Sequence, residues 1–589
     1  MVGFFSIFYT RFGTTDDVEM QMVLAGKAVL QEPSAYLRWT HIFIGQLLSS
    51  LYTYFPTIPW YGLYLCAAHL IGLSAILYSI LIHKASLFRI VIFISAFVLG
   101  ASAMLQELQF TSAALMLGTG AICLLFTAIS NPQHASVKRW YAISFALFLA
   151  VTMMRWGSFQ LTVVLGTPLL LYGIFQQNQK RGFNLAFCTS ILIAAWGLNE
   201  VHYSIQNQHP GWKAFNTYKK LLAGPDIVDY NKPQYHWTPS SADDYFYKVG
   251  WEYEDLMLFK HWFFADSTVY GLEKFQALQA TFQSCPYPEE HIEERLWQFF
   301  IEFPLEDYVF YGFLILALSC LFIRGNRWLY LLLGATALLV FSALLGLFVY
   351  KHMPNRVSYP MAFYLITLAS LFITYDKEIH RKTKLFTLVF LAVIAISNLK
   401  KVTLASSNAA FNKMYWTEAL DSLDAQPGQL YVGGGDYYMQ HLMTHFQNPS
   451  DSMFLNFNMV DFGHLANTPT FYKQLENFGI KNVHTEAPLD SNIYLIHQYG
   501  APFLSWYASF IRRHYDMHVS FEAIRHDEEL GIAIFAITEQ IREETNSQGI
   551  NLANMHEFGL ELKDPDEIPM DSTKPTATYR EGQEFIMGN

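Results

Sequence analysis

The chain has 589 residues, of which 52% are hydrophobic and only 15% are charged. Soluble domains carry about 25% charged residues, so this composition indicates a membrane protein. The formal net charge of −11 argues against nucleic acid as a partner, because binding to phosphate backbones needs a basic face.

The N-terminal segment, residues 1–59, begins with the apolar stretch MVGFFSIFY, which is too short to cross a bilayer. We expect it to be either a truncated first span or a segment in the membrane plane. An acidic cluster follows in GTTDDVEMQ, where Asp16, Asp17 and Glu19 precede the long apolar region. One aspartate could simply cap the helix that begins in VEMQMVLAG, although a cap needs only one of the two.

The stretch LRWTHIFIGQLLSSLYTYFPTIPW, residues 37–60, follows the acidic cluster. Its apolar residues recur at helical spacing, and two prolines stop the pattern before Trp60. This predicts an amphipathic helix lying in the outer membrane interface. A short re-entrant hairpin is the alternative.

Apolar runs of near-spanning length then fill the regions 60–205 and 306–402. The runs are 60–83, 87–105, 109–130, 139–155, 156–176, 182–205, 306–324, 327–350, 357–375 and 383–400. Residues 139–176 are divided at Arg155, because a single span of that length would not fit a bilayer. The pattern predicts an α-helical polytopic membrane protein with about 10–11 transmembrane helices.

The loops between these runs alternate in charge. Basic residues gather in one set of loops, at Lys84, Arg89, Lys138, Arg139, Lys180, Arg181, Arg324, Arg327, Lys377, Arg381, Lys382 and Lys384. Short loops rich in Lys and Arg remain in the cytoplasm. The rule therefore predicts that the acidic segment, the loop 206–305 and the chain after residue 402 are extracytoplasmic.

Residues 403–538 change character and predict an extracytoplasmic α/β domain. GQLYVGGGDYYMQHLMTHF reads as strand, turn and helix, and TPTFYKQLENFGIKNV as helix and strand. SNIYLIHQY predicts a strand, APFLSWYASFIRRHY an amphipathic helix, and MHVSFEAIRH and LGIAIFAIT two more strands. GGGD at Gly433–Asp436 lacks the spacing of a phosphate loop, so a turn is expected. Residues 539–589 are polar and predict a disordered tail.

Charged residues of both signs are predicted at the outer membrane boundary. They are Asp16, Asp17, Glu19, Arg38, His41, Glu107, Arg155, Lys351, His352 and Arg356. Ionisable groups at membrane depth are costly and are usually paired or functional. A carboxylate can act as a general base or hold a cation, and an arginine can grip phosphate oxygens. Together they suit displacement at the anomeric carbon of a sugar, with a lipid phosphate leaving.

The chain resembles the GT-C glycosyltransferases, membrane enzymes that transfer a sugar from a polyprenyl-phosphate donor on the extracytoplasmic side. The resemblance rests on TTDD in the first external segment, the amphipathic helix after it, the many spans and the external C-terminal domain. It implies that Asp16 or Asp17 is catalytic and that Glu107 is a second acidic position. Asp17 and Glu107 could then hold a divalent cation, Mg²⁺ or Mn²⁺.

The same resemblance implies that Arg356 binds the donor phosphate, a task that Lys351 and Arg155 are expected to share. The alternatives without a catalytic or binding role are that Glu107 is an ordinary loop residue and that Arg356 anchors its helix at the interface. His41 is expected to be an ordinary interface residue.

The loop 206–305 contains YFYKVGWEYEDLMLFKHWFFAD, which is dense in aromatic and acidic residues. Trp faces can stack on a sugar ring, and carboxylates can accept hydrogen bonds from its hydroxyls. We therefore expect Trp251, Asp255, Trp262 and Asp266 to help form a cleft for the donor or acceptor sugar. The alternative is that these residues pack the external domain.

The leading hypothesis is a glycosyltransferase of the inner or plasma membrane that transfers a sugar to a cell-envelope glycan, lipid or protein. A transporter or flippase is the alternative from another class, and it would favour broken helices and internal repeats. A surface-glycan polymerase or ligase is a mechanistic neighbour that the sequence does not separate from the first.

Overall fold

The structure is a computed structural model, and the residues that it describes fall in several ranges. They are 2–27, 30, 32–82, 94, 101–177, 180–222, 249–260, 263–283, 296–297, 299, 308–320, 327–350, 355–372, 381–422, 428–433, 443–448, 458–463, 466–498, 502–527 and 532–539. The predicted tail lies outside these residues, apart from Glu539 at the end of the last strand.

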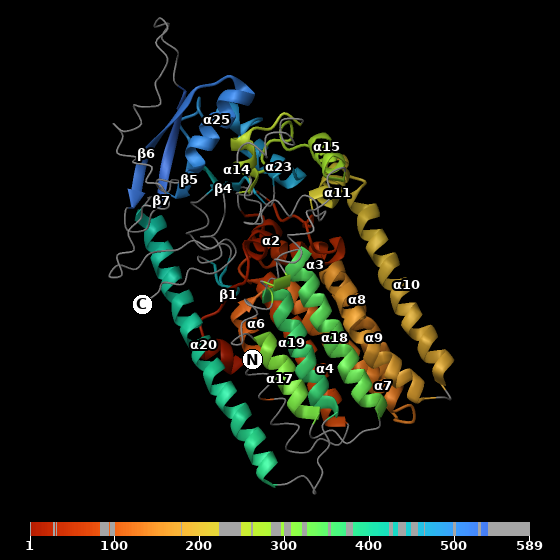
Figure 1. The fold of residues 1–589 in the computed structure, drawn as a ribbon. Coiled ribbons are helices and arrows are strands. Elements are labelled where there is room, and N and C mark those ends of the chain that lie inside the picture. The colour runs from red at the N-terminus through yellow and green to blue at the C-terminus, as the bar shows by residue number, and fades with distance from the viewer. Residues whose placement is uncertain are drawn as a thin grey trace, which may run out of the picture. The chain divides into compact units, whose positions relative to one another are not determined.

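A bundle of long apolar helices forms most of the N-terminal half (Figure 1). Within the described residues, six helices are long and apolar enough to cross a membrane, so the chain is an integral membrane protein. They are α4 (Trp60–Ile82), α7 (Phe110–Ser130), α8 (Val137–Met154), α9 (Trp156–Gln176), α10 (Arg181–Gln206) and α18 (Arg327–Tyr350). The helices α17 (Tyr308–Cys320) and α19 (Asn355–Phe372) also belong to this bundle.

Helix α7 is the centre of the bundle, and its residues from Phe110 to Ile129 are all buried. Small side chains let its neighbours approach closely, as is usual between membrane helices. A Cβ atom added at Gly72 of α4 would lie 2.6 Å from the carbonyl oxygen of Met116 on α7. A Cβ atom at Gly120 of α7 would lie 2.7 Å from the carbonyl oxygen of Gly72.

The predicted helices agree with the structure wherever it describes them. The division at Arg155 is confirmed, because this residue is extended (φ −161°, ψ 116°) and separates α8 from α9. The predicted span 87–105 lies largely outside the described residues, and its end forms the short helix α6 (Ser102–Gln106). The predicted boundary near residue 402 is wrong, because α20 (Arg381–Ser422) runs through it without a break.

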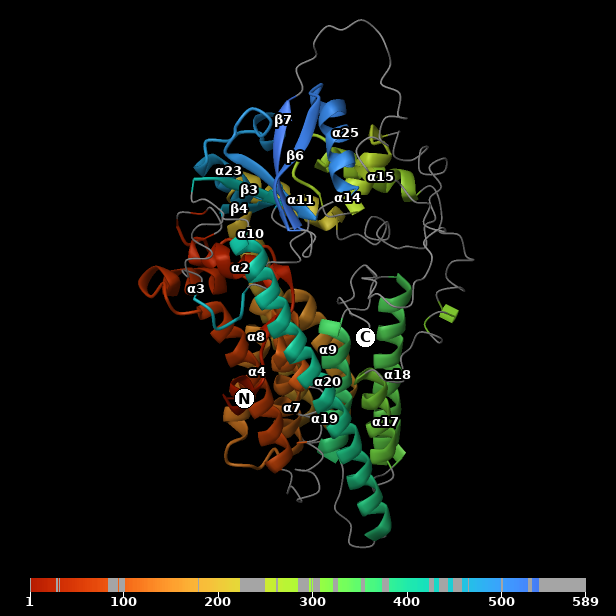
Figure 2. The same cartoon turned by 90° about the vertical axis from the view of Figure 1, so that its left-hand side faces the viewer.

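The acidic segment includes a helix, α2, that lies between the helical bundle and the C-terminal sheet (Figures 1 and 2). It comprises α1 (Val2–Ile7), β1 (Arg11–Phe12) and α2 (Thr15–Ala25), and β1 pairs in parallel with β2 (Glu107–Leu108). The predicted amphipathic helix is α3 (Ile42–Tyr54), a single helix that ends in a turn rather than a hairpin. Its exposed apolar side chains are those of Phe43, Leu47, Tyr54 and the following Phe55, which suits contact with lipid.

The C-terminal α/β region is present, with five strands among the described residues. The strands β3 (Leu430–Gly433), β4 (Asn458–Asp461), β5 (Ile493–Gln498), β6 (Val519–Asp527) and β7 (Ile532–Glu539) follow the order β4-β3-β5-β7-β6. The β3 strand is parallel to β4 and β5, whereas β7 is antiparallel to β5 and β6. The helices α23 (Pro469–Asn477), α24 (Val483–Glu486) and α25 (Phe503–Tyr515) accompany this sheet.

Two details of this region differ from the sequence prediction. Strand β4 was not predicted, and the stretch GIKNV forms no strand but leads into α24, which begins at Val483. The Asn482 side chain accepts a hydrogen bond from the backbone N–H of His484 and so caps that helix. In the GGGD stretch, Gly433 ends β3 and the other three residues lie outside the described residues.

The loop 206–305 does not fold separately from the C-terminal sheet. Its helices α11 (Pro210–Leu222), α14 (Tyr253–Lys260) and α15 (Leu272–Gln283) share one apolar core with the strands. The Phe263 ring, for example, lies 5.0 Å from that of Phe462 and 5.2 Å from that of Phe510 between ring centroids. Residues more than 150 positions apart therefore form one composite domain above the bundle.

The segment 443–448 joins this composite domain to the bundle at Gly62 of α4, where an added Cβ atom would lie 1.8 Å from the carbonyl oxygen of His445. We expect Gly62→Ala to destabilise the protein by about 1–3 kcal/mol, because the extra methyl group overpacks this contact. Thermal unfolding in detergent measures the effect.

The matched control is Gly197→Ala in α10, where an added Cβ atom meets nothing within 4 Å. This change should be neutral or stabilise by up to about 1 kcal/mol, since Ala favours helix over Gly. Equal unfolding temperatures for the two variants would contradict the proposed contact at Gly62.

Candidate functional site

The two aspartates of the acidic cluster stand in the first turn of α2. Thr14 occupies the N-cap position, so neither aspartate has the capping role that the sequence left open. The Thr14 hydroxyl donates to Oδ2 of Asp17 over 2.8 Å. Adjacent positions on a helix point in directions about 100° apart, so the two side chains meet different surroundings.

Asp17 is fully buried and connects three helices. Its Oδ1 atom accepts hydrogen bonds from the Tyr61 hydroxyl of α4 at 2.8 Å and from the backbone N–H of Phe110 at 3.1 Å. Burial is the largest cause that raises the pKa of Asp17 to about 7, although these hydrogen bonds act in the opposite direction. Its contacts therefore favour a structural role, holding α2 against the starts of α4 and α7.

Glu107 lies in β2, directly opposite Arg11 of β1. Its carboxylate forms an ion pair with Arg11, with 2.6 Å between Oε1 and Nη2. Phe110 follows β2 by two residues, and its backbone N–H donates to Asp17. Strand β2 therefore lies beside the first turn of α2. Glu107 itself is paired with a neighbouring cation.

The expected Mg²⁺ or Mn²⁺ site between Asp17 and Glu107 does not fit these contacts. Both Asp17 oxygens already accept hydrogen bonds, and the Glu107 carboxylate is held by Arg11. Among the residues that the structure describes, no group of three or more His, Cys, Asp or Glu side chains could hold a metal ion. We therefore derive no chemical step from a metal.

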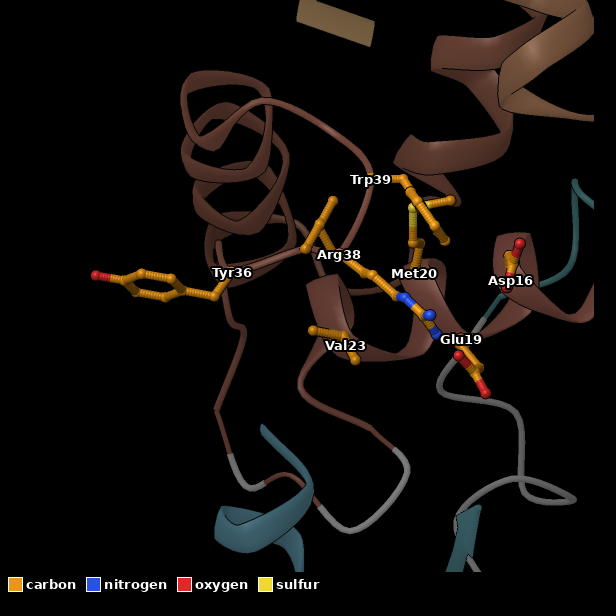
Figure 3. Close-up of a pocket in the computed structure, with 8 residues that line it drawn as sticks. Asp16, Glu19, Met20, Val23, Tyr36, Arg38 and Trp39 are labelled. Atoms are coloured by element: carbon orange, nitrogen blue, oxygen red, sulfur yellow. The ribbon is translucent and has the colours of Figure 1, made fainter. Parts of the chain in front are cut away.

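A pocket opens beside α2, on the side of Asp16 (Figure 3). One wall is formed by α2 residues at helical spacing and the other by the segment before α3. The lining residues are Asp16, Glu19, Met20, Val23, Tyr36, Leu37, Arg38 and Trp39, and the space among them is small and partly open to solvent. Figure 3 shows the Arg38 guanidinium pointing toward the Glu19 carboxylate.

Three cations meet at the indole ring of Trp39. The Nζ atom of Lys219 lies 4.2 Å from the ring centroid, Cζ of Arg38 lies 4.7 Å away, and Cζ of Arg155 lies 5.6 Å away. They come from three parts of the chain, because Lys219 belongs to α11 and Arg155 to the junction of α8 and α9. A cation over an indole ring gains about 0.5–2 kcal/mol, depending on its exposure.

Hydrogen bonds fix these cations further. Lys219 donates from Nζ to the carbonyl oxygen of Arg38, and Arg155 donates to the Thr111 hydroxyl of α7. The Arg155 guanidinium also lies 4.8 Å from the ring centroid of Phe110, the residue whose N–H binds Asp17. The buried aspartate and the cation cluster are thus joined through the start of α7.

The electrostatics of the site show repulsion among its cations. The pKa of Lys219 is lowered to about 7, mainly by burial and then by the charges of Arg38 and Arg155. The pKa of Arg155 is lowered to about 10, again mainly by burial and then by the charge of Arg356. Asp16 acts in the opposite direction on both groups. An anion bound among these side chains would relieve the repulsion.

The structure therefore brings together Asp16, Asp17, Arg155 and Arg356 of the predicted site. Arg356 stands at the start of α19 and is close enough to Arg155 for its charge to act there. Glu107 lies beside the group but is paired with Arg11. Lys351, the other predicted phosphate ligand, lies outside the described residues.

The predicted sugar cleft is not found at Trp251 and Asp255. Trp251 is 1% exposed, donates from its indole N–H to the carbonyl oxygen of Val269 and packs against Tyr270. Asp255 is fully buried and accepts from Nη1 of Arg513 at 2.8 Å and from Nε2 of His514 at 3.0 Å. These contacts favour the alternative that both residues pack the composite domain.

Asp266 has a similar place in the composite domain. Its Oδ1 atom accepts from the backbone N–H and the hydroxyl of Thr268, and its Oδ2 atom accepts from the Tyr515 hydroxyl. Burial acts to raise the pKa of this carboxyl, but His484 and then the hydrogen bonds from Thr268 and Tyr515 lower that pKa below its ordinary value. Trp262, the fourth predicted residue, lies outside the described residues.

Sequence reasoning missed two members of the site, Lys219 and Trp39. Arg38 and Glu19 were counted among the charges of the outer boundary but were given no role. The amphipathic spacing of α11 was the one available signal for Lys219, which lies on the side of that helix that faces Trp39. Nothing in the sequence near Trp39 indicates that cations from distant segments converge there.

Comparison with known proteins gives little further information. No protein-family model matches the sequence, and no curated protein matches it. Similar solved structures include those of ArnT from Cupriavidus metallidurans in the apo state and bound to undecaprenyl phosphate. Each is 11% identical, the match covers 93% of this chain and 97% of that chain, and the TM-scores are 0.36 and 0.37. TM-scores this low do not establish a common fold.

The buried carboxyl of Asp17 should make stability depend on pH. Its pKa is about 7 in the folded protein against an ordinary value of 3.8, so the folded state holds a proton that the unfolded chain has lost. The stabilisation is fully present below about pH 4 and is lost as the pH rises to about 7, at roughly 1 kcal/mol per pH unit.

Asp17→Asn should fold and remove this slope, because the amide can donate to Thr14 while its oxygen still accepts from Tyr61 and Phe110. Thermal unfolding in detergent between pH 5 and pH 8 compares the variant with the wild type. The exposed Glu273→Gln on α15 serves as the control and should keep the wild-type slope. Parallel curves for Asp17→Asn and the wild type would refute the assignment.

Proposed function

We propose that this protein is a GT-C-type membrane glycosyltransferase that moves a sugar from a polyprenyl-phosphate-linked donor to a cell-envelope acceptor. One observation carries the proposal. The carboxylate of Asp16 lines a pocket together with Arg38 and Trp39, at the end of a bundle of membrane-spanning helices. Arg38, Arg155 and Lys219 surround the indole ring of Trp39. The Asp16 carboxylate can act as a base and the cations can bind an anion, and both lie at the end of the membrane bundle, where the head group of a lipid would bind.

The cations account for the leaving group. Arg38 and Arg155 carry planar guanidinium groups that can each bind two phosphate oxygens, and Lys219 adds a compact charge. Arg356 adds a further positive charge beside Arg155. The negative charge that develops on a departing lipid phosphate would be stabilised by these groups, which are already in place before the reaction.

Asp16 supplies the base in this proposal. It takes the proton from an acceptor hydroxyl, whose oxygen forms a bond to the anomeric carbon of the sugar. The bond between that carbon and the phosphate oxygen breaks, and its electron pair leaves with the lipid phosphate. This single displacement inverts the anomeric configuration. Glu19, on the same wall of the pocket, faces the Arg38 guanidinium (Figure 3).

We place the site and the composite domain on the extracytoplasmic side of the inner or plasma membrane. The basic residues Lys138, Arg139 and Arg181 stand at the starts of α8 and α10, whereas Arg155 follows the end of α8. The site therefore lies at the opposite helix ends from these basic residues, and the Lys-rich and Arg-rich ends are expected in the cytoplasm. The charges also gather at one end rather than at mid-depth, which does not favour a transporter.

Asp16→Asn should abolish transfer while the protein still folds. The purified protein is incubated with a panel of polyprenyl-phosphate-linked sugars and an envelope membrane extract, and release of polyprenyl phosphate is followed by mass spectrometry. Loss of a general base lowers the rate by about 10²–10⁴-fold. A wild type that neither releases nor binds polyprenyl phosphate would overturn the proposed function. Full activity of Asp16→Asn would remove this residue as the base.

Lys219→Met should weaken donor binding more than it slows the chemical step. The change removes the positive charge that lies over the Trp39 ring, and Trp39 lines the pocket. We expect the KM for the donor to rise by about tenfold or more. Lys213→Met on the same helix is the matched control, because Lys213 is exposed. Equal KM values for the two variants would contradict the phosphate role of Lys219.

A further inference from the structure

We propose that Trp39 positions the lipid phosphate in two ways. Its indole ring holds Arg38, Arg155 and Lys219 together before the ligand arrives, and its indole N–H donates a hydrogen bond to an anionic oxygen of the phosphate. This inference rests on the proposed function and assigns to that site a residue that carries no charge.

The ring provides the first part of this role. Its centroid lies 4.2 Å from Nζ of Lys219, 4.7 Å from Cζ of Arg38 and 5.6 Å from Cζ of Arg155. The three side chains would otherwise separate, because positive charges repel each other strongly in a partly buried site. The negative face of an aromatic ring attracts cations without neutralising them, so their charge stays available to an anion.

The N–H group provides the second part. The Nε1 atom of Trp39 is buried, and it has no hydrogen-bond partner among the described residues. Other indoles of the chain find one: Trp60 donates to the carbonyl oxygen of Phe55, Trp140 to the Tyr78 hydroxyl and Trp251 to the carbonyl oxygen of Val269. A buried indole N–H usually has a partner, because leaving it unsatisfied costs free energy.

The position of Trp39 indicates what that partner is. An indole N–H can only donate, so its partner must be an acceptor. Trp39 lines the pocket together with Asp16, Glu19 and Arg38 (Figure 3). A phosphate oxygen placed there would accept from the indole and would also lie among the cations that the ring holds. A neutral acceptor would satisfy the N–H group but would not reduce the repulsion among the cations.

Two substitutions separate the two parts. Trp39→Phe keeps an aromatic face for the cations and loses the N–H group, whereas Trp39→Leu loses both. Trp196→Leu in α10 is the matched control, because this residue is 60% exposed and does not line the pocket. Polyprenyl phosphate binding to the full-length protein in detergent gives Kd, and donor turnover gives KM and kcat.

Trp39→Phe should raise Kd and KM by about five- to tenfold and leave kcat within about twofold, as expected for one lost hydrogen bond to a charged group. Trp39→Leu should raise them by about 100-fold, and Trp196→Leu should match the wild type. Partial rescue by Phe relative to Leu is a result that a merely structural role would not give.

The outcomes distinguish the inference from the function on which it rests. If the wild type binds no polyprenyl phosphate, the proposed function fails and the inference falls with it. If the wild type binds and both Trp39 variants bind equally well, the function stands and the inference is overturned. Should Trp39→Leu not fold, Trp39→Phe decides alone, since unchanged binding would overturn the inference. Inorganic phosphate should bind at least about 100-fold more weakly than the lipid, and equal affinity would overturn the lipid assignment.

Discussion

Positive charges repel one another most strongly where water is scarce, and three of them surround the indole ring of Trp39. Such an arrangement is stable only if several rigid elements hold it. The segment before α3 supplies Arg38 and Trp39, the break between α8 and α9 supplies Arg155, and α11 supplies Lys219. The membrane bundle and the composite domain must therefore both be folded before the site exists. The charge pattern depends on the whole assembly rather than on a local motif.

The adjacent residues Asp16 and Asp17 lie in the same helical turn but have different surroundings. Asp17 points into the protein, where it accepts hydrogen bonds from Thr14, Tyr61 and Phe110. Asp16 lines the pocket, where it faces the cations. Because Asp17 is fully buried, a substrate hydroxyl cannot reach its carboxyl, so Asp17 is poorly placed to act as the base. Its neighbour has access to the pocket because the buried residue keeps the turn in place.

The sequence predicts most of the elements and few of their partners. Apolar runs reveal the membrane helices because the bilayer fixes their length, and Arg155 marks a true break because a charge at mid-span is costly. Alternating strands of the C-terminal region were recognisable for a similar local reason. Trp251, Asp255 and Asp266 had the composition of a binding site, yet burial and long-range hydrogen bonds decide their role. Lys219 reaches Trp39 from 180 positions away, a contact that no local pattern encodes.

Helix α20 connects the two halves of the fold without interruption (Figure 2). Its 42 residues extend about 63 Å at 1.5 Å per residue. It is tied to the N-terminal region where Gln106 donates to the carbonyl oxygen of Val402 and where the backbone N–H of Tyr9 donates to the Ser406 hydroxyl. A continuous helix resists twisting and bending, so α20 is expected to move as one rigid element. The sheet therefore cannot swivel over the pocket unless the whole of α20 tilts with it.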